Sequence, residues 1–263
     1  MNILEKIIAH KRGEVAEAKA MTPVAELERR PFFGRDVLSL RASLNDPGKT
    51  GIIAEFKRRS PSKGVINDKV SVVEVTKGYT EAGAACLSVL TDRNFFGGAP
   101  EDLEAARVNP IPILRKDFII DEYQLLEAKA MGADVILLIA ACLKPKEVRQ
   151  LARVADSLGL EVLLEIHGED ELEHICDETP LVGVNNRDLK TFSVDVERSI
   201  RLSQQIPTGK LLIAESGINR VETIWHMRDS GFRGFLVGEH FMKEQSPAIA
   251  FASFVQQLKS RRR

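Results

Sequence analysis

An acidic and a basic residue close the first strongly apolar run of this chain. Ile53, Glu55 and Lys57 alternate along that run, so on one β-strand their side chains would project from the same face. In parallel α/β folds, catalytic groups lie where the strands end. The pattern therefore predicts a carboxylate and an ammonium that project together from the C-terminal end of a strand.

The turn that follows this run carries groups that suit a phosphate. Ser60 and Ser62 supply hydroxyls, Gly64 leaves its backbone N–H accessible, and Lys63 adds a cation. These groups predict a phosphorylated small-molecule substrate. The alternative, from this segment alone, is an ordinary strand that is followed by a solvated basic loop.

Four later apolar runs end in the same way. Counting by two from the apolar positions places a polar or charged residue on the inward side of each run, namely Lys116, Glu165, Asn185 with Arg187, and Glu215. These groups can meet only if the strands are parallel and share one rim.

The elements that must position these groups alternate along the chain. Strand-like runs cover residues 51–57, 85–91, 111–116, 134–140, 161–166, 181–186, 211–215 and 234–238, and helical patterns cover residues 72–82, 121–131, 144–158 and 219–230. This is the spacing of consecutive βαβ units, and about eight of them close a (β/α)8 TIM barrel. An open doubly wound sheet gives the same local pattern. The barrel is favoured because no Gly-x-Gly-x-x-Gly motif follows the first strand.

The first 50 residues precede the barrel pattern and have helical character. They are broken at residues 31–34 and end in a turn at residues 45–48. We expect residues 1–50 to form an N-terminal helical extension and residues 51–263 to form the barrel, as a single domain. The extension could cover one end of the barrel or pack on its outside.

Composition limits the classes of function. With 44% hydrophobic residues among 263, the chain can bury one large core. A net charge of −1 does not favour nucleic-acid binding, and the arginines at residues 261–263 are interpreted as a frayed tail. No apolar stretch approaches the roughly 20 residues of a membrane-spanning helix.

Cysteine and histidine spacing indicates neither a metal nor an oxidising compartment. The three cysteines are odd in number and widely spaced, which fits reduced thiols and offers no zinc pattern. His167, His226 and His240 lack metal-ligand spacing and are interpreted as satisfied or exposed. No targeting peptide is recognisable. We expect a cytoplasmic monomer or weak homodimer without metal or cofactor.

Two glycine-containing turns follow the last two strand-like runs. Ser216 and Gly217 follow one run, and Gly238 and Glu239 follow the other. TIM barrels build their phosphate sites after strands seven and eight, from backbone N–H groups and a short helix N-terminus. Gly217 and Gly238 would let a phosphate approach the backbone closely.

The motifs taken together resemble a known family. Residues 53–64 are similar to the signature of indole-3-glycerol phosphate synthase, an enzyme family of tryptophan biosynthesis. Further similarities follow in order at residues 90–98, 114–118, 183–189 and 214–218, and the N-terminal extension also resembles that of the family. The resemblance implies a lyase that acts on 1-(2-carboxyphenylamino)-1-deoxyribulose 5-phosphate. Ring closure and the loss of carbon dioxide and water would yield indole-3-glycerol phosphate.

The resemblance also implies roles for the charged residues. Lys116 is the candidate general acid for ring closure, and Glu165 is the candidate base for dehydration. Lys57 would pair with the substrate carboxylate and could donate the second proton, with Glu55 holding its ammonium. Which lysine serves which proton transfer stays open. For Lys116 to act near neutral pH, we expect desolvation and neighbouring cations to lower its pKa.

The remaining candidates would bind the substrate. Asn185 and Glu215 would hydrogen-bond the developing hydroxyls, and Arg187 would anchor the carboxylate or brace a neighbouring one. Phe96 and Phe118 would form an apolar wall for the anthranilate ring. Ser216 is a further candidate for substrate binding. The candidate phosphate ligands are Ser60, Gly217, Gly238 and Glu239, and Glu239 departs from the small residue of other family members.

Two other functions are compatible with parts of the pattern. A Schiff-base aldolase would use Lys116 or Lys57 to attack a phosphosugar carbonyl. A non-catalytic sensor or assembly subunit would bind a phosphorylated metabolite without turnover, and it would not need both a lysine acid and a carboxylate base. Each charged residue could also belong to a structural salt bridge at the barrel rim.

Overall fold

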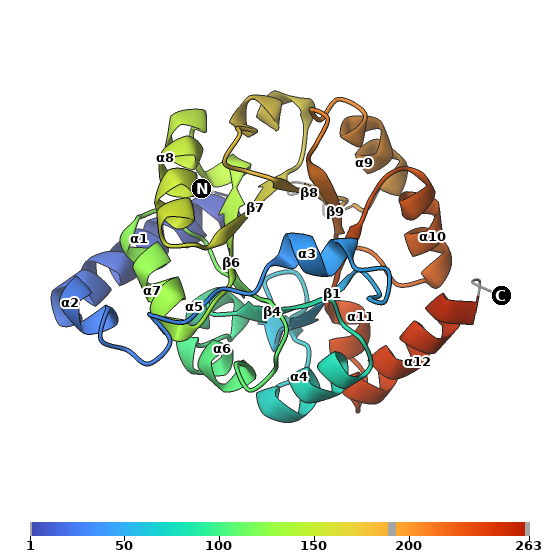
Figure 1. Cartoon of the computed structure of the whole chain (residues 1–263), viewed down its shortest axis with the longest axis horizontal. Helices are drawn as coiled ribbons and strands as arrows, with labels where there is room; N and C mark the ends of the chain where they lie inside the picture. Colours follow the sequence, from blue (N-terminus) through green and yellow to red (C-terminus); the bar gives the residue numbers. More distant parts are fainter. Residues whose placement is uncertain (1, 189–192, 261–263) are drawn as a thin grey trace.

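The computed structural model describes residues 2–188 and 193–260. Leu189, which ends one of the motifs, and the arginines at 261–263 lie outside the described residues. In the described part, eight parallel strands close a barrel in the order β1-β10-β9-β8-β7-β6-β5-β4, which confirms the predicted TIM barrel (Figure 1). The strands are β1 (Ile52–Phe56), β4 (Cys86–Leu90), β5 (Ile113–Lys116), β6 (Val135–Ile139), β7 (Glu161–Ile166), β8 (Leu181–Asn185), β9 (Leu211–Glu215) and β10 (Gly234–Val237).

Helices precede the barrel and connect its strands. They are α1 (Ile3–Met21), α2 (Val24–Leu27), α3 (Leu40–Asn45), α4 (Val72–Glu81), α5 (Arg93–Phe96), α6 (Pro100–Ala106), α7 (Tyr123–Met131), η1 (Ala140–Cys142), α8 (Pro145–Ser157), η2 (Glu169–His174), α9 (Val196–Ser203), α10 (Val221–Asp229), α11 (Glu239–Met242) and α12 (Pro247–Ser260). Directly after β1, the short strands β2 (Arg59–Ser60) and β3 (Gly64–Val65) form an antiparallel hairpin. Among the described residues, no helix combines the length and the apolar character that crossing a membrane requires.

Alternation along the strands separates two apolar layers. Ile53, Leu163 and Ile213 belong to a cluster in the barrel interior, whereas Phe56 belongs to the larger layer between the strands and the helices. Every barrel strand lies within a run that the sequence predicts, so the predicted parity is kept. Glu165 therefore projects on the same side as Leu163, toward the barrel axis.

The helix α3 closes the end of the barrel where the strands begin. Leu40 and Leu44 of this helix pack into the interior cluster. Ser39, which caps α3, donates a hydrogen bond of 2.6 Å to Oε1 of Glu161, the first residue of β7. Figure 1 shows α3 crossing in front of the barrel strands.

The helix α1 reaches the opposite end, where the strands finish. It begins with a capping box, in which Asn2 and Glu5 exchange hydrogen bonds of 2.8 and 2.9 Å between side chains and backbone N–H groups. Ile3 and Ile7 of this helix line a cavity at the C-terminal ends of the strands. Segments that precede the barrel in the sequence thus touch both of its ends.

Candidate active site

A large cavity opens at the C-terminal end of the barrel. Its volume is about 1340 Å³, and it brings together all of the site residues that the sequence predicts. These are Glu55, Lys57, Ser60, Phe96, Lys116, Phe118, Glu165, Asn185, Arg187, Glu215, Ser216, Gly217, Gly238 and Glu239. The polar strand ends therefore share one rim, as the parity argument requires.

Lys116 and Glu165 form the centre of this cavity. Lys116 ends β5 and Glu165 lies near the end of β7, and Lys116 Nζ is 3.6 Å from Glu165 Oε2. Asn185, at the end of β8, donates a hydrogen bond of 3.0 Å from Nδ2 to Glu165 Oε1. The backbone N–H of Arg187 in turn donates to Asn185 Oδ1 at 3.0 Å, which fixes the orientation of that amide. A proton donor and an acceptor thus face the same space.

The carboxylates around Lys116 set its protonation state. Burial lowers the pKa of Lys116, but attraction to Glu165, Glu215 and Glu55 outweighs burial and raises the pKa above its ordinary value. The expected lowering of this pKa is therefore wrong, because the barrel rim surrounds Lys116 with acidic groups. Lys116 is an ammonium throughout the neutral pH range.

The pKa values of Glu165 and Glu215 are shifted in opposite directions. Burial raises the pKa of Glu165, but Lys116 and His167 outweigh it and hold the pKa below the ordinary value. Burial and the negative charge of Glu165 hold the pKa of Glu215 well above its ordinary value. A proton shared by this pair is consequently held by Glu215 rather than by Glu165.

A second charged pair lies at the end of β1. Lys57 Nζ is 2.6 Å from Glu55 Oε1, and Ser88 Oγ donates to Glu55 Oε2 at 3.4 Å. Burial raises the pKa of Glu55, but Lys57 and Lys116 outweigh it and hold the pKa below its ordinary value. Gly238 makes room for this pair, since a Cβ there would lie 2.5 Å from Glu55 Oε1. Glycine is needed at position 238 because the backbone there packs closely against Glu55. The sequence alone does not reveal this contact.

The predicted phosphate ligands lie together at one side of the cavity. Ser216 and Gly217 both have left-handed backbone conformations, with φ of 69° and 70°. A Cβ on Gly217 would collide with Val194, so glycine is required there. Glu239 begins α11, and its carboxylate lies 3.9 Å from Lys63 Nζ of the hairpin after β1.

Two phenylalanines face each other at another part of the cavity. The ring centroids of Phe96 and Phe118 are 5.9 Å apart, with an interplanar angle of 38°. Phe96 ends α5, and Phe118 follows β5 by two residues. Both rings line the cavity, and they form an apolar surface within reach of its charged centre.

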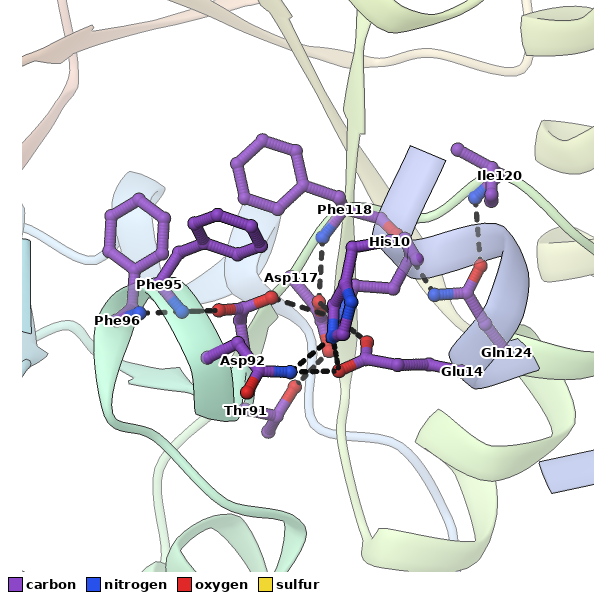
Figure 2. A network of polar contacts seen from close by, with 12 residues as sticks. His10, Glu14, Thr91, Asp92, Phe95, Phe96, Asp117, Phe118, Ile120 and Gln124 are labelled. Atoms are coloured by element: carbon purple, nitrogen blue, oxygen red, sulfur yellow. Dashed lines mark hydrogen bonds and ion pairs between the residues drawn. The ribbon is translucent and has the colours of Figure 1, made fainter. Parts of the chain in front are cut away.

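A buried cluster of charges anchors both phenylalanines to α1. Lys11 Nζ lies 3.0 Å from Asp92 Oδ2 and 2.9 Å from Asp117 Oδ1. Asp92 accepts hydrogen bonds from the backbone N–H groups of Phe95 and Phe96, and Asp117 accepts one of 2.8 Å from that of Phe118 (Figure 2). The N-terminal helix thus fixes the backbone at both rings.

Replacement of Lys11 should destabilise the fold. Lys11→Met should lower the free energy of unfolding by about 3 kcal/mol, because the loss of one partner leaves buried charges uncompensated. The midpoint of thermal unfolding at pH 7 should fall by about 10 °C. Lys19→Met is the matched control. Lys19 lies on the same helix as Lys11 and forms an exposed 2.8 Å pair with Asp121, so this substitution should lower the free energy of unfolding by less than about 1 kcal/mol. Equal losses in the two variants would contradict the assigned role of Lys11.

His167 is a polar residue of the cavity that was not among the predicted site residues. His167 lines the cavity and lies 3.1 Å from Glu165 through Nε2. The sequence analysis considered this histidine only as a possible metal ligand, and that criterion does not reveal its position beside Glu165. The signal that finds it is strand parity, because residues 165 and 167 share one side of β7 and its continuation.

Comparison with known proteins agrees with this geometry. Residues 4–254 match the family model described as indole-3-glycerol phosphate synthase. A protein of that name from Bacteroides thetaiotaomicron is 47% identical over 256 residues, which cover 97% of this chain and 98% of the relative. One from Bordetella pertussis is 44% identical over 259 residues, which cover 97% of this chain and 99% of the relative.

The fold also recurs among solved structures. A chain from the tryptophan synthase α2β2 complex of Pyrococcus furiosus superimposes with a TM-score of 0.59, and the match covers 80% of this chain and 98% of that chain. At 17% identity this likeness concerns the fold alone. The near full-length sequence matches go further, and this chain belongs to the indole-3-glycerol phosphate synthase family.

Proposed function

We propose that the cavity converts 1-(2-carboxyphenylamino)-1-deoxyribulose 5-phosphate into indole-3-glycerol phosphate, with Lys116 and Glu165 as its general acid and base. The activity follows from the family. The assignment of residues is supported by one observation above all: an ammonium lies 3.6 Å from an ionised carboxylate in a buried cavity. The two groups carry the protonation states that a donor and an acceptor need.

Ring closure needs a proton donor at the ketone oxygen. The aromatic carbon that carries the carboxylate attacks the ketone carbon, and the carbonyl electron pair moves to oxygen. Lys116 gives its proton to that oxygen, so the product is a hydroxyl rather than an alkoxide. The raised pKa of Lys116 ensures that the proton is present before the reaction.

Loss of carbon dioxide then restores the aromatic ring. The bond between the ring carbon and the carboxylate breaks, and its electron pair returns to the ring. Lys57 is proposed to pair with the substrate carboxylate before this step, and Arg187, two residues after β8, is proposed to anchor it. Glu55 holds the Lys57 ammonium in place at 2.6 Å.

Dehydration completes the indole. Glu165 removes a proton from the carbon next to the ring nitrogen, and the hydroxyl leaves from the neighbouring carbon as water after it accepts a proton. Lys57 is the proposed donor of that second proton. Asn185 and Glu215, whose pKa is raised, are proposed to hydrogen-bond the hydroxyls that form along the route.

Two groups of cavity residues are proposed to orient the substrate. The anthranilate ring is proposed to lie against Phe96 and Phe118. The phosphate is proposed to bind the group after β1, β9 and β10, which consists of the hydroxyls of Ser60 and Ser216 and the backbone N–H groups of Gly217, Gly238 and Glu239. This route uses no metal and no cofactor.

The site is less suited to Schiff-base chemistry. A lysine must lose its proton before its amine can attack a carbonyl, and the surrounding carboxylates oppose that loss at Lys116. We therefore expect borohydride treatment in the presence of substrate to leave Lys116 and Lys57 unmodified. A trapped adduct at either lysine would support the imine route instead.

A direct assay tests the proposed function. The purified chain should convert the carboxyphenylamino ribulose phosphate to a product with indole absorbance and fluorescence, in buffer without added metal or cofactor. Binding of the substrate without turnover would support a sensor and contradict the proposal.

Gel filtration with light scattering will test the further expectation of a monomer or weak homodimer, and fractionation of cells will test the expected cytoplasmic location.

Lys57 should contribute to substrate binding in addition to its proposed proton transfer. Lys57→Ala should raise KM by about tenfold to a hundredfold, because it removes a charge-assisted hydrogen bond to the substrate carboxylate. Lys69→Ala removes an exposed lysine downstream of the same hairpin and should leave KM within about twofold. Steady-state kinetics on both variants will check this. An unchanged KM for Lys57→Ala would remove Lys57 from the binding site.

A further inference from the structure

The two oxygens of the Glu165 carboxylate have different surroundings. Oε1 accepts the 3.0 Å hydrogen bond from Asn185 and lies 3.1 Å from His167 Nε2. Oε2 faces Lys116 at 3.6 Å and has no hydrogen-bond partner among the described residues. One oxygen is therefore held by the protein, and the other is left for chemistry in the cavity.

His167 is itself held on its far side. Its side chain is only 11% exposed, and Nδ1 lies 3.4 Å from Glu171 Oε2 in η2. The same Glu171 oxygen accepts a hydrogen bond of 2.6 Å from the backbone N–H of His167. Glu171, His167 and Glu165 thus form a chain of contacts that begins in the loop after β7 and ends at the proposed base.

We propose that His167 is a positioning residue for the reaction. Its Nε2 pairs with Glu165 Oε1 at 3.1 Å and, together with Asn185, orients the carboxylate so that Oε2 faces the substrate. This inference rests on the proposed role of Glu165 as the base. A general base acts only when its accepting oxygen is aligned with the proton that it removes, so a rotated carboxylate lowers kcat more than it affects binding.

The electrostatics of His167 are consistent with a permanent donor. Burial lowers the pKa of His167, but its contacts with Glu165 and Glu171 outweigh burial and raise the pKa to about 10. Both ring nitrogens therefore carry protons at neutral pH. Among the described residues, Asn185, Lys116 and Glu215 are the other polar groups that interact with the same carboxylate.

Two substitutions of His167 separate positioning from packing. His167→Leu removes the donor and should lower kcat by about tenfold to a hundredfold, the usual loss when a contact that orients a functional ligand is removed. KM should stay within about twofold. His167→Gln places an amide N–H near the position of Nε2 and should restore kcat to within about fivefold of the parent. His226→Leu removes a surface histidine that contacts Glu197 at 2.7 Å and should leave kcat unchanged.

A double-mutant cycle tests whether His167 acts through Glu165. In a Glu165→Gln background, His167→Leu should lower kcat by no more than about twofold, because the group that it positions is already gone. A loss as large as in the parent would show an independent role and overturn the inference. If Glu165→Gln itself leaves kcat unchanged, the proposed function fails first, and the two failures are thus distinguishable.

A third variant keeps the test decisive if His167→Leu does not fold. Glu171→Ala removes the partner of Nδ1 and should lower kcat several-fold in the parent but not in the Glu165→Gln background. Equal losses in both backgrounds would overturn the inference. So would a folded His167→Gln protein with kcat reduced a hundredfold.

Discussion

Glu165→Gln should lower kcat by about a thousandfold, the typical contribution of a positioned general base. The amide cannot accept the proton that dehydration requires. It can still accept the hydrogen bond from Asn185, so the local packing is kept. The negative charge of Glu165 also contributes to the raised pKa of Glu215. Glu215 should therefore ionise more readily in the variant and keep the charge of Lys116 balanced.

The stage at which this variant stalls gives the sharper result. If Glu165 is the base for dehydration, ring closure and loss of carbon dioxide should still occur. In a single turnover with substrate labelled in its carboxyl group, labelled carbon dioxide should then appear faster than indole fluorescence. Simultaneous slow appearance of both products would move Glu165 to an earlier step.

Glu161→Gln is the matched control for this variant. Glu161 begins the same strand β7 and accepts a hydrogen bond from Ser39 at the closed end of the barrel, far from the cavity mouth. Its replacement should leave kcat within about twofold, since substitutions away from the site have small effects. If Glu165→Gln retains activity within a few-fold of the parent and stays folded, Glu165 is not the base.

Much of this site could be predicted from local sequence pattern. Parallel strands that are covered on both faces keep a strict alternation, and that alternation alone placed Lys116, Glu165 and Asn185 on the inner side. Eight strand-like runs at regular spacing then bring the inner positions of distant segments to one rim. The predicted and observed positions agree because strand alternation and the spacing of consecutive βαβ units can both be recognised from local sequence.

Properties that depend on distant partners could not be predicted in this way. The pKa of Lys116 was expected to fall, but it is raised by carboxylates that come from β1, β7 and β9. The burial of Lys11 against Asp92 and Asp117 joins α1 to two strand ends far along the chain. The pattern of charges around Lys11 in its own helix gives no indication of either partner.

Removal of the Lys116 ammonium should have an equally large effect through two routes. Lys116→Ala should lower kcat by about a thousandfold or more, because ring closure loses its proton donor. The loss also acts on Glu165, whose pKa is held down chiefly by attraction to Lys116. Without that ammonium the pKa of Glu165 should rise, so the residual activity should fall at a higher pH than in the parent as acid is added.

Two further measurements distinguish these routes. Lys116→Arg keeps a positive charge beside Glu165 but offers a much weaker acid, so it should restore the pH profile without restoring kcat. A small alkylammonium ion added to Lys116→Ala can occupy the vacated space and should raise kcat in proportion to its concentration. Because this ion replaces only the missing donor, rescue should restore carbon dioxide release and indole formation together. If Lys116→Ala releases labelled carbon dioxide at the parental rate and fails only at dehydration, ring closure has another acid, and Lys57 becomes the candidate.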